Sequence, residues 1–373
     1  MADYEVDYSD IAGRKVECPE GCGMCCLCQP EVLPEERAFF RENYPERMIK
    51  TRGPDAHFAL AMKKGCGSCV FLSDGKRKCQ VYDHRTAYCR QYPFHLYLSD
   101  RVKVELDMSC RGVWTGNGTD AMAEAKDIVA KADRRIVSTL RESRAVYGQF
   151  YANCKEAGIL SDQSILRMSV SENLSNFADL GYLSKVMELS QMEPVMSLSG
   201  VQKEVRPDMP ELEIAARESA LDSMATNDPL NAPVYCDPEW NWNVFMAKDE
   251  NIVWNILTDS GDLVQKGSAE ASEIPLKPLE EDGAKVLADY IRILNGRDSF
   301  MGSVFSLIDY NDYEDDMANA YYGCLSVTVL DLMWRASMLD HFTKCGMGAK
   351  GIQEAVIFYD MDRLDAPAIG AFV

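Results

Sequence analysis

Five cysteines fall within eleven residues near the start of the chain, in the stretch CPEGCGMCCLC from Cys18 to Cys28. Ten of the 14 cysteines lie between Cys18 and Cys110. A chain of 373 residues can bury a sizeable apolar core, so it does not need disulfides to stay folded. Its first residues, MADYEVDYSD, lack the basic and apolar segments of a signal peptide, and no window has the roughly 18 apolar residues of a membrane span. We therefore expect a soluble cytoplasmic protein, away from membranes, whose thiols bind metal; a disulfide framework is the less favoured alternative.

The net charge of −20 is unevenly distributed. Residues 14–113 hold 17 Lys and Arg against 13 Asp and Glu, whereas the remaining residues hold 22 against 46. Such an acidic chain disfavours nucleic-acid binding, because neutralising phosphates requires clustered cations. We expect a protein partner or protein substrate instead, and the sequence leaves the oligomeric state open.

The composition predicts an α+β fold that is mainly helical. A small, loop-rich, metal-organised domain is expected over 14–118. An acidic, mostly helical domain is expected over 119–373, with an antiparallel β-meander near 240–267 and a softer sub-boundary near 200–230. Apolar spacing and turn residues predict helices over 34–45, 120–158, 172–191, 210–224, 281–295 and 317–344, a short helix near Gly351, and strands in KCQVYD and RVKVELD.

Two C-x2-C turns, Cys22 with Cys25 and Cys66 with Cys69, have the spacing that lets two thiolates converge on one metal. Gly21 and Gly23 suit the positive-φ geometry of such a turn. Neighbouring side chains are expected to diverge, so Cys25 should not share one tetrahedral ion with the next cysteine. The stretch therefore indicates either two sites, or one cluster and a separate thiolate.

The stretches CPEGCGMCC, CVFLSDGKRKCQVYDHRTAYCRQYPFHL and CRGVWTGNG resemble the YkgJ-type cysteine-cluster family of zinc- or iron-chelating CxxCxxCC domains over residues 18–118. The sequence departs from the family pattern in two places: three residues separate the first two cysteines, and Thr86 stands where a proline is usual. Cys28 and Cys66 are thiols beyond the family pattern, and they either are extra ligands or do not bind the metal. The resemblance implies eight metal ligands, namely Cys18, Cys22, Cys25, Cys26, Cys69, Cys79, Cys89 and Cys110.

The implied centre is all-thiolate, because the four histidines do not have zinc-finger spacing. A [4Fe–4S] cluster and zinc both accept thiolates. A related branch of the family, the flagellin lysine N-methylases, pairs a four-iron cluster with S-adenosylmethionine. This relationship favours the [4Fe–4S] cluster over zinc and adds S-adenosylmethionine as a further cofactor.

Arg85 and Arg90 flank Cys89 and could neutralise cluster charge or bind an anion such as a substrate carboxylate. Alternatively, Arg90 pairs with an acid and the adjoining aromatic residues pack in the core. Cys154, Cys236, Cys324 and Cys345 lie in apolar elements and are expected to tolerate alanine.

Three functions remain open: redox chemistry or cluster-dependent protein modification, a non-catalytic partner-binding or assembly role with structural zinc, and S-adenosylmethionine-dependent protein methyl transfer. The sequence offers no catalytic triad or P-loop, and it does not establish that the chain is an enzyme.

Overall fold

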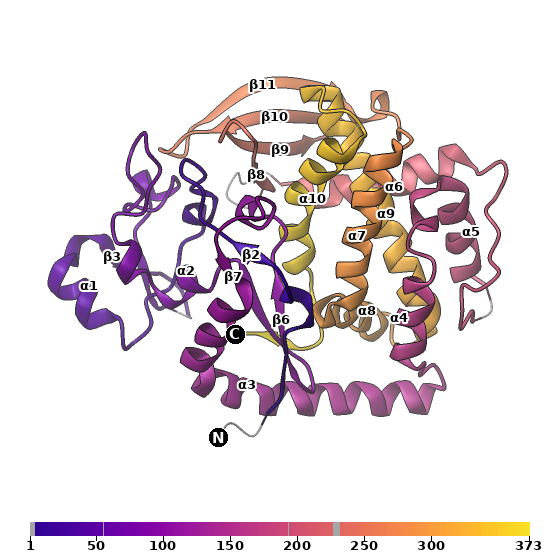
Figure 1. Cartoon of the computed structure of the whole chain (residues 1–373), viewed down its shortest axis with the longest axis horizontal. Coiled ribbons are helices and arrows are strands. Elements are labelled where there is room, and N and C mark those ends of the chain that lie inside the picture. Colours follow the sequence, from indigo (N-terminus) through magenta and orange to yellow (C-terminus); the bar gives the residue numbers. More distant parts are fainter. Residues whose placement is uncertain (1–3, 55, 193, 227–231) are drawn as a thin grey trace.

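The computed structural model describes residues 4–54, 56–192, 194–226 and 232–373. Within these ranges the fold is α+β and mainly helical, as the sequence predicts (Figure 1). The helices are α1 (Arg37–Asn43), α2 (Ala87–Gln91), α3 (Ala121–Ala157), α4 (Gln163–Ser171), α5 (Leu180–Ser190), α6 (Met209–Met224), α7 (Glu281–Gly296), α8 (Asp298–Tyr310), α9 (Met317–Thr343) and α10 (Ala349–Leu364).

The strands form two four-stranded sheets and two short pairs. The first sheet has the order β1 (Val6–Asp7), β6 (Val102–Leu106), β5 (Phe94–Leu98), β12 (Ala371–Phe372). The second has the order β11 (Leu263–Glu270), β10 (Asn251–Leu257), β9 (Trp242–Lys248), β8 (Val234–Cys236). The short pairs are β2 (Lys15–Val16) with β7 (Thr119–Asp120), and β3 (Met48–Lys50) with β4 (Phe58–Leu60).

The main core forms around α9, whose buried residues fall on all sides of the helix. A helix buried all round belongs to the interior of a protein and not to its surface. Helices α5, α6, α8 and α10 pack against α9. The long helix α3 runs beneath both the cysteine-rich part and the helical body (Figure 1), with one face packed in the same core.

Strand β6 is buried along its whole length, although its sequence alternates apolar and charged residues. Lys103 pairs with Asp7 at 2.9 Å. The Glu105 carboxylate accepts hydrogen bonds from the backbone N–H groups of Asp298 and Ser299, at the first turn of α8. The charged side chains of β6 are therefore buried with polar partners, as buried charges require.

The first 118 residues and the rest of the chain are joined by several contacts. Strand β12, at the end of the chain, pairs with β5 in the first sheet. Arg111 forms a buried ion pair with Glu354 of α10. The domain boundary near residue 118 stays a prediction, and part of the sub-boundary predicted near 200–230 lies outside the described residues.

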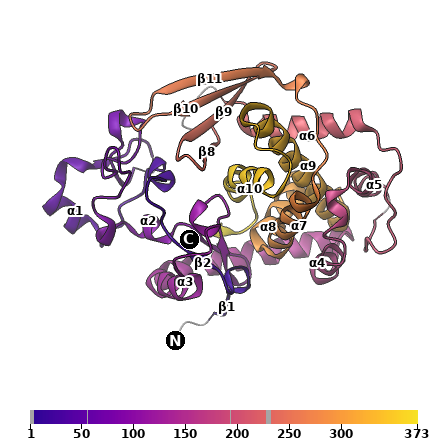
Figure 2. The ribbon, with the colours of Figure 1, turned by 45° about the horizontal axis from the view of Figure 1, so that its top comes forward.

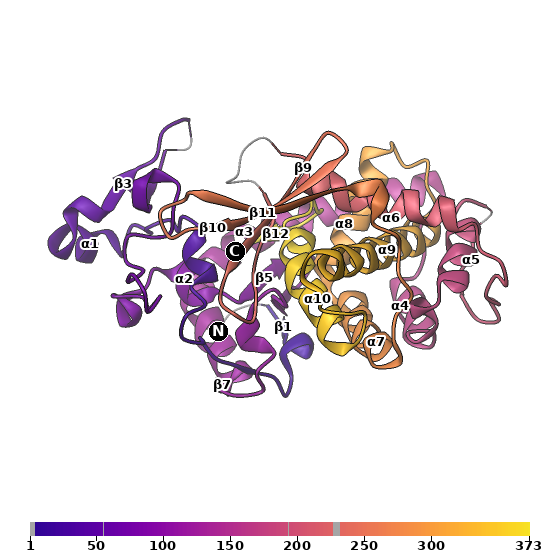
Figure 3. The ribbon, with the colours of Figure 1, turned by 90° about the horizontal axis from the view of Figure 1, so that it is seen from above.

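The predicted β-meander is present as β9, β10 and β11, and β8 extends it to four strands. In Figures 2 and 3 the β10–β11 hairpin reaches from the helical body across to the cysteine-rich part. At its tip, the Asp259 carbonyl accepts a 3.1 Å hydrogen bond from the N–H of Ser68. A Cβ atom at Gly67 would lie 2.6 Å from that carbonyl oxygen, so this close approach requires glycine.

Several predicted elements differ in the structure. KCQVYD is not a strand: Tyr82–His84 form a 3-10 turn, and the segment's N–H groups are used in turns and one isolated bridge. Helices α2, α4 and α8 lie outside the predicted helical ranges. The helix near Gly351 is the sixteen-residue α10. In the described part of the chain, no helix has the length and apolarity needed to cross a membrane.

Candidate metal centre

The cysteines of residues 18–110 come from five separate segments that meet beside α2. Cys18 to Cys28 lie on one loop, which contains the 3-10 turn Met24–Leu27. Cys66 and Cys69 follow β4, Cys79 lies in the next loop, Cys89 lies in α2, and Cys110 precedes the 3-10 turn Arg111–Val113. The fold therefore gathers residues that are far apart in the sequence.

A cavity of about 310 Å³ lies among these segments. Its thiol-bearing wall residues are Cys18, Cys25, Cys26, Cys28, Cys69, Cys79 and Cys89. Cys18 and Cys28 are exposed, whereas Cys69 is buried. The cavity thus extends from the surface into the interior with thiols along its depth.

A second cavity, of about 290 Å³, adjoins the first and is lined by Cys18, Cys22, Cys25 and Cys110. Cys18 and Cys25 line both cavities. All eight cysteines implied by the family resemblance therefore line one or both cavities, and so does Cys28. Cys66 lines neither cavity and is exposed, with its Sγ atom 3.9 Å from the Lys64 carbonyl oxygen.

The first C-x2-C turn has the backbone that its sequence predicts. Gly21 has φ +94° and Gly23 has φ +59°, which confirms the positive-φ expectation for both. The N–H of Cys26 donates to the Gly23 carbonyl at 3.0 Å, and the N–H of Cys69 donates to the Cys26 carbonyl at 2.8 Å. The second hydrogen bond ties the two C-x2-C segments together.

The expectation that adjacent cysteine side chains diverge is wrong for Cys25 and Cys26. Both residues line the first cavity, and interaction between their thiols lowers the pKa of Cys25. Both residues lie in the 3-10 turn Met24–Leu27, and both side chains line the same cavity. Their adjacency therefore gives no reason to assign them to separate sites.

Burial raises the pKa of several thiols in this region. Burial raises the pKa of Cys69 to about 11 and that of Cys89 to about 12. Burial also raises the pKa of Cys110 above its ordinary value. In contrast, the interaction with the Cys26 thiol lowers the pKa of Cys25. Binding a metal would release protons, because the thiolate is the ligand form.

The cavity walls fit a thiolate-bound metal in donor type and number. Among the described residues that line the two cavities, none is a histidine. His84 stacks on Phe39, with ring centroids 4.5 Å apart, and His95 Nε2 lies 3.4 Å from an Asp107 oxygen. No group of three or more His, Cys, Asp or Glu side chains in the described ranges already forms a coordination sphere. Ligation would therefore require the thiols to turn inward from the cavity walls.

Arg85 and Arg90 lie at the edge of the thiol cavities. Arg85 lines both, donates from Nη1 to the Cys89 carbonyl at 3.4 Å, and stacks on the Tyr82 ring at 3.9 Å. Arg90 pairs with Glu36 at 3.2 Å, in line with the alternative that this arginine has an acidic partner. Anion binding by either arginine stays a prediction.

Cys236 of β8 lies beside the site, although its sequence context does not indicate it. Interaction with its thiol lowers the pKa of the Cys22 thiol. Its Sγ atom also lies 3.9 Å from the Cys22 carbonyl oxygen. No local signal marks Cys236, because only the fold brings β8 to the first C-x2-C turn.

Arg77 and two tryptophans form a wall beneath the same turn. Trp240 lies against Gly21 and Trp242 against Gly23, and each ring comes within 3.1 Å of where a Cβ would stand. The Arg77 guanidinium lies 3.8 Å from the Trp242 ring centroid, and its Nε donates to Asp259 at 3.1 Å. Side chains of the second sheet therefore support the metal-binding loop directly.

Residues 17–111 match the model of the CxxCxxCC family, whose description is "Putative zinc- or iron-chelating domain". The match covers the cysteine-rich part and stops before α3. No curated protein and no solved structure matches the chain.

Proposed function

We propose that this chain, whose residues 17–111 are identified with the zinc- or iron-chelating CxxCxxCC family, binds a [4Fe–4S] cluster and acts in redox chemistry or cluster-dependent protein modification. The observation that carries the proposal is the gathering of eight predicted ligand cysteines around two adjoining cavities. Candidate ligands are drawn from these eight thiols, with Cys28 as a further donor.

The size of the first cavity favours a cluster over a single zinc ion. A structural zinc ion and a [4Fe–4S] cluster each take four thiolates, and seven thiols line this cavity, so the number of thiols suits both. The volume of about 310 Å³, however, is more than one ion fills. When bound, a [4Fe–4S] cluster supplies one-electron transfer, with a potential that depends on hydrogen bonds to sulfur and on solvent exposure.

The surroundings of the cavities suit a centre that meets a large substrate. Cys18 and Cys28 are exposed, so the first cavity opens to the surface. The second cavity adjoins a charged groove, because Tyr82, Arg85 and Arg90 line both. This arrangement supports action on a protein substrate or partner. S-adenosylmethionine enters the proposal only as the methyl donor that the resemblance to methylases implies.

The test is anaerobic purification, followed by iron, zinc and acid-labile sulfide analysis and an absorbance spectrum on the same sample. We expect about four iron and four sulfide per chain, with absorption near 400 nm that bleaches on reduction. S-adenosylmethionine binding would be measured next. One or two colourless zinc ions per chain would contradict the cluster and favour a structural zinc site in a partner-binding protein.

A further inference from the structure

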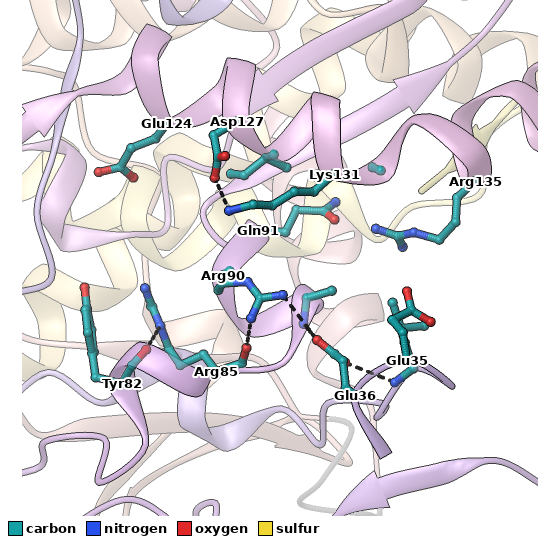
Figure 4. A pocket seen from close by; sticks show the side chains of 14 residues that line it. Glu35, Glu36, Tyr82, Arg85, Arg90, Gln91, Glu124, Asp127, Lys131 and Arg135 are labelled. Atoms are coloured by element: carbon teal, nitrogen blue, oxygen red, sulfur yellow. Dashed lines mark hydrogen bonds and ion pairs between the residues drawn. The ribbon is translucent and has the colours of Figure 1, made fainter. Parts of the chain in front are cut away.

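A charged groove of about 530 Å³ lies between α2 and α3, beside the cysteine-rich part (Figure 4). Arg90 and Gln91 of α2 line one wall, and Lys131 and Arg135 of α3 line the opposite wall. Residues 33–36 close one end. Because α3 lies beyond residue 111, the wall that α3 contributes is outside the segment that matches the family model.

Two of the cations in the groove already have carboxylate partners. Arg90 pairs with Glu36, and Lys131 pairs with Asp127 one turn earlier on α3. Glu36 also accepts the N–H of Ala87 at 2.7 Å, which holds the start of α2. These pairs belong to the walls of the groove and are not free for a ligand.

Two other cations have no carboxylate partner. Within the described residues, neither Arg85 nor Arg135 has a carboxylate within 4.0 Å of its guanidinium. Arg135 lies with its guanidinium carbon 5.1 Å from the Tyr88 ring centroid, and its Nη1 is buried without a hydrogen-bond partner. A buried cationic donor of this kind favours an anionic acceptor.

Gln91 has a side-chain acceptor without a hydrogen-bond partner in the described part of the chain. Its side-chain N–H donates to the Val373 carbonyl at 2.6 Å, which leaves Oε1 as the free end of the amide. That Oε1 is buried and has no hydrogen-bond partner in the described part of the chain. Figure 4 shows Gln91 and Arg135 reaching into the groove from opposite helices. One groove thus holds an unpaired acceptor and an unpaired cationic donor.

We propose that this groove binds a peptide segment that carries a carboxylate. The carboxylate of the peptide forms an ion pair with Arg135, and a main-chain N–H of the peptide donates a hydrogen bond to Gln91 Oε1. Arg85 provides a second positive charge on the side of the thiol cavities. Because Tyr82, Arg85 and Arg90 also line the second thiol cavity, a peptide held here lies next to the metal centre. The role of this peptide as a substrate rests on the proposed function, whereas its binding does not.

The probe is a fluorescein-labelled ten-residue peptide of glycine and serine with one central glutamate, compared with the same peptide carrying glutamine. Fluorescence anisotropy with the full chain, before and after metal removal, gives the two affinities. We expect the glutamate peptide to bind at least tenfold more tightly, and Arg135→Gln to abolish that preference. Arg134→Gln is the matched control, because Arg134 is the exposed neighbour on α3 and does not line the groove.

Arg135→Lys keeps the charge but loses the forked donor, so it should retain part of the preference. Equal affinity for the two peptides, or an equal loss in Arg134→Gln and Arg135→Gln, would overturn the proposal. Competition by free glutamate as strong as that by an unlabelled capped peptide would overturn it in favour of a small carboxylate ligand. Metal analysis of the same samples separates the two hypotheses. A protein that contains metal but does not bind the peptide would refute peptide binding in the groove. A protein that binds the peptide but contains no metal would refute the proposed function.

Discussion

The indole N–H of Trp242 donates a 2.7 Å hydrogen bond to the carbonyl oxygen of Cys22. Both residues are buried, and they are 220 positions apart in the chain. Trp242 begins β9, so the sheet contributed by the second half of the chain holds the first C-x2-C turn in place. The cysteine loop is thus not supported by its own segment alone.

Trp242→Phe should loosen this turn. The substitution keeps an aromatic ring against Gly23 but removes the indole donor of the buried Cys22 carbonyl, which keeps only the weak 3.9 Å contact from Cys236 Sγ; the loss costs about 1–3 kcal/mol. We expect a lower free energy of unfolding together with weaker metal retention. Urea titration and a chelator-competition assay measure the two effects on the same preparation.

Trp254→Phe is the matched control for Trp242→Phe. Trp254 lies in the same sheet and donates a hydrogen bond of equal length, 2.7 Å, to Asn243 Oδ1. Its ring packs against Phe245 and Phe342, whereas that of Trp242 lies against Gly23. The control variant should lose stability and keep its metal. Equal loss of metal from both variants would show that the sheet as a whole, and not the contact with Cys22, governs retention.

The elements that the sequence predicts well are those whose pattern is local. The apolar spacing of residues 120–158 gives α3, and the spacing of residues 317–344 gives α9. Helix α8 escapes detection because it begins two residues after α7 ends: Asn295 and Gly296 mark the end of the predicted helix, and no loop separates it from the next one. KCQVYD is strand-like in composition but finds no partner strand, and a strand is stable only within a sheet.

The residues of the site likewise fall into those that a local motif predicts and those that only the fold brings there. Spacing and resemblance select the cysteines that line the cavities, because the C-x2-C turns are local motifs. Cys236, Trp242 and Arg135 carry no such signal, since β8, β9 and α3 bring them to the site through tertiary packing. The two adjacent thiols Cys25 and Cys26 lie in one 3-10 turn and share a wall, which spacing alone does not reveal.

Removing a thiol at the junction of the two cavities should remove the metal. Cys25 lines both cavities and Cys22 lines the second, so Cys22→Ser or Cys25→Ser leaves an open coordination position. We expect at least a tenfold fall in metal content and loss of structure in the cysteine-rich part, because metal binding and folding are coupled in such domains. Metal analysis and circular dichroism measure the two effects.

Cys66→Ser is the control for these serine variants. Cys66 belongs to a C-x2-C turn by sequence but is exposed and lines neither cavity. It should keep full metal content and an unchanged unfolding midpoint. A Cys66→Ser protein that lost its metal would place this thiol among the ligands and would revise the assignment of the cavity walls.

Cys236→Ala should weaken metal binding, in contrast to the tolerance expected from its sequence. The Cys236 thiol interacts with that of Cys22, and residues that support a metal ligand typically change affinity by about 10- to 100-fold when mutated. Cys154→Ala offers the comparison, because Cys154 is equally buried but packs in the main core at the end of α3. Chelator competition should separate the two variants, while their losses of stability should be similar. If the two variants bound metal with the same affinity, the role of Cys236 would be limited to packing.

Asp298 should make the stability of the protein sensitive to acid. It accepts hydrogen bonds from Arg101 Nε at 2.7 Å and from Arg167 Nη2 at 3.0 Å. Burial alone would raise the pKa of Asp298, but the hydrogen bond with Arg101 and the charge of Arg167 lower it overall. A carboxyl with a lowered folded-state pKa stabilises the fold above its unfolded value of about 3.9, and this contribution is lost as the pH falls through the folded-state value.

Asp298→Asn should therefore cost about 1.5–3 kcal/mol at pH 7, the usual worth of hydrogen bonds to a charged group, and progressively less below pH 4. Urea midpoints of wild type and variant at pH 7, 5, 4 and 3 measure this difference. Asp74→Asn is the control, because Asp74 pairs with Lys63 at 2.7 Å but its side chain is 87% exposed. Exposed pairs contribute little, so the control should stay close to wild type throughout. If the loss of unfolding free energy in Asp298→Asn were as large at pH 3 as at pH 7, the carboxylate charge would contribute nothing. The asparagine would then act by disturbing the packing at the start of α8.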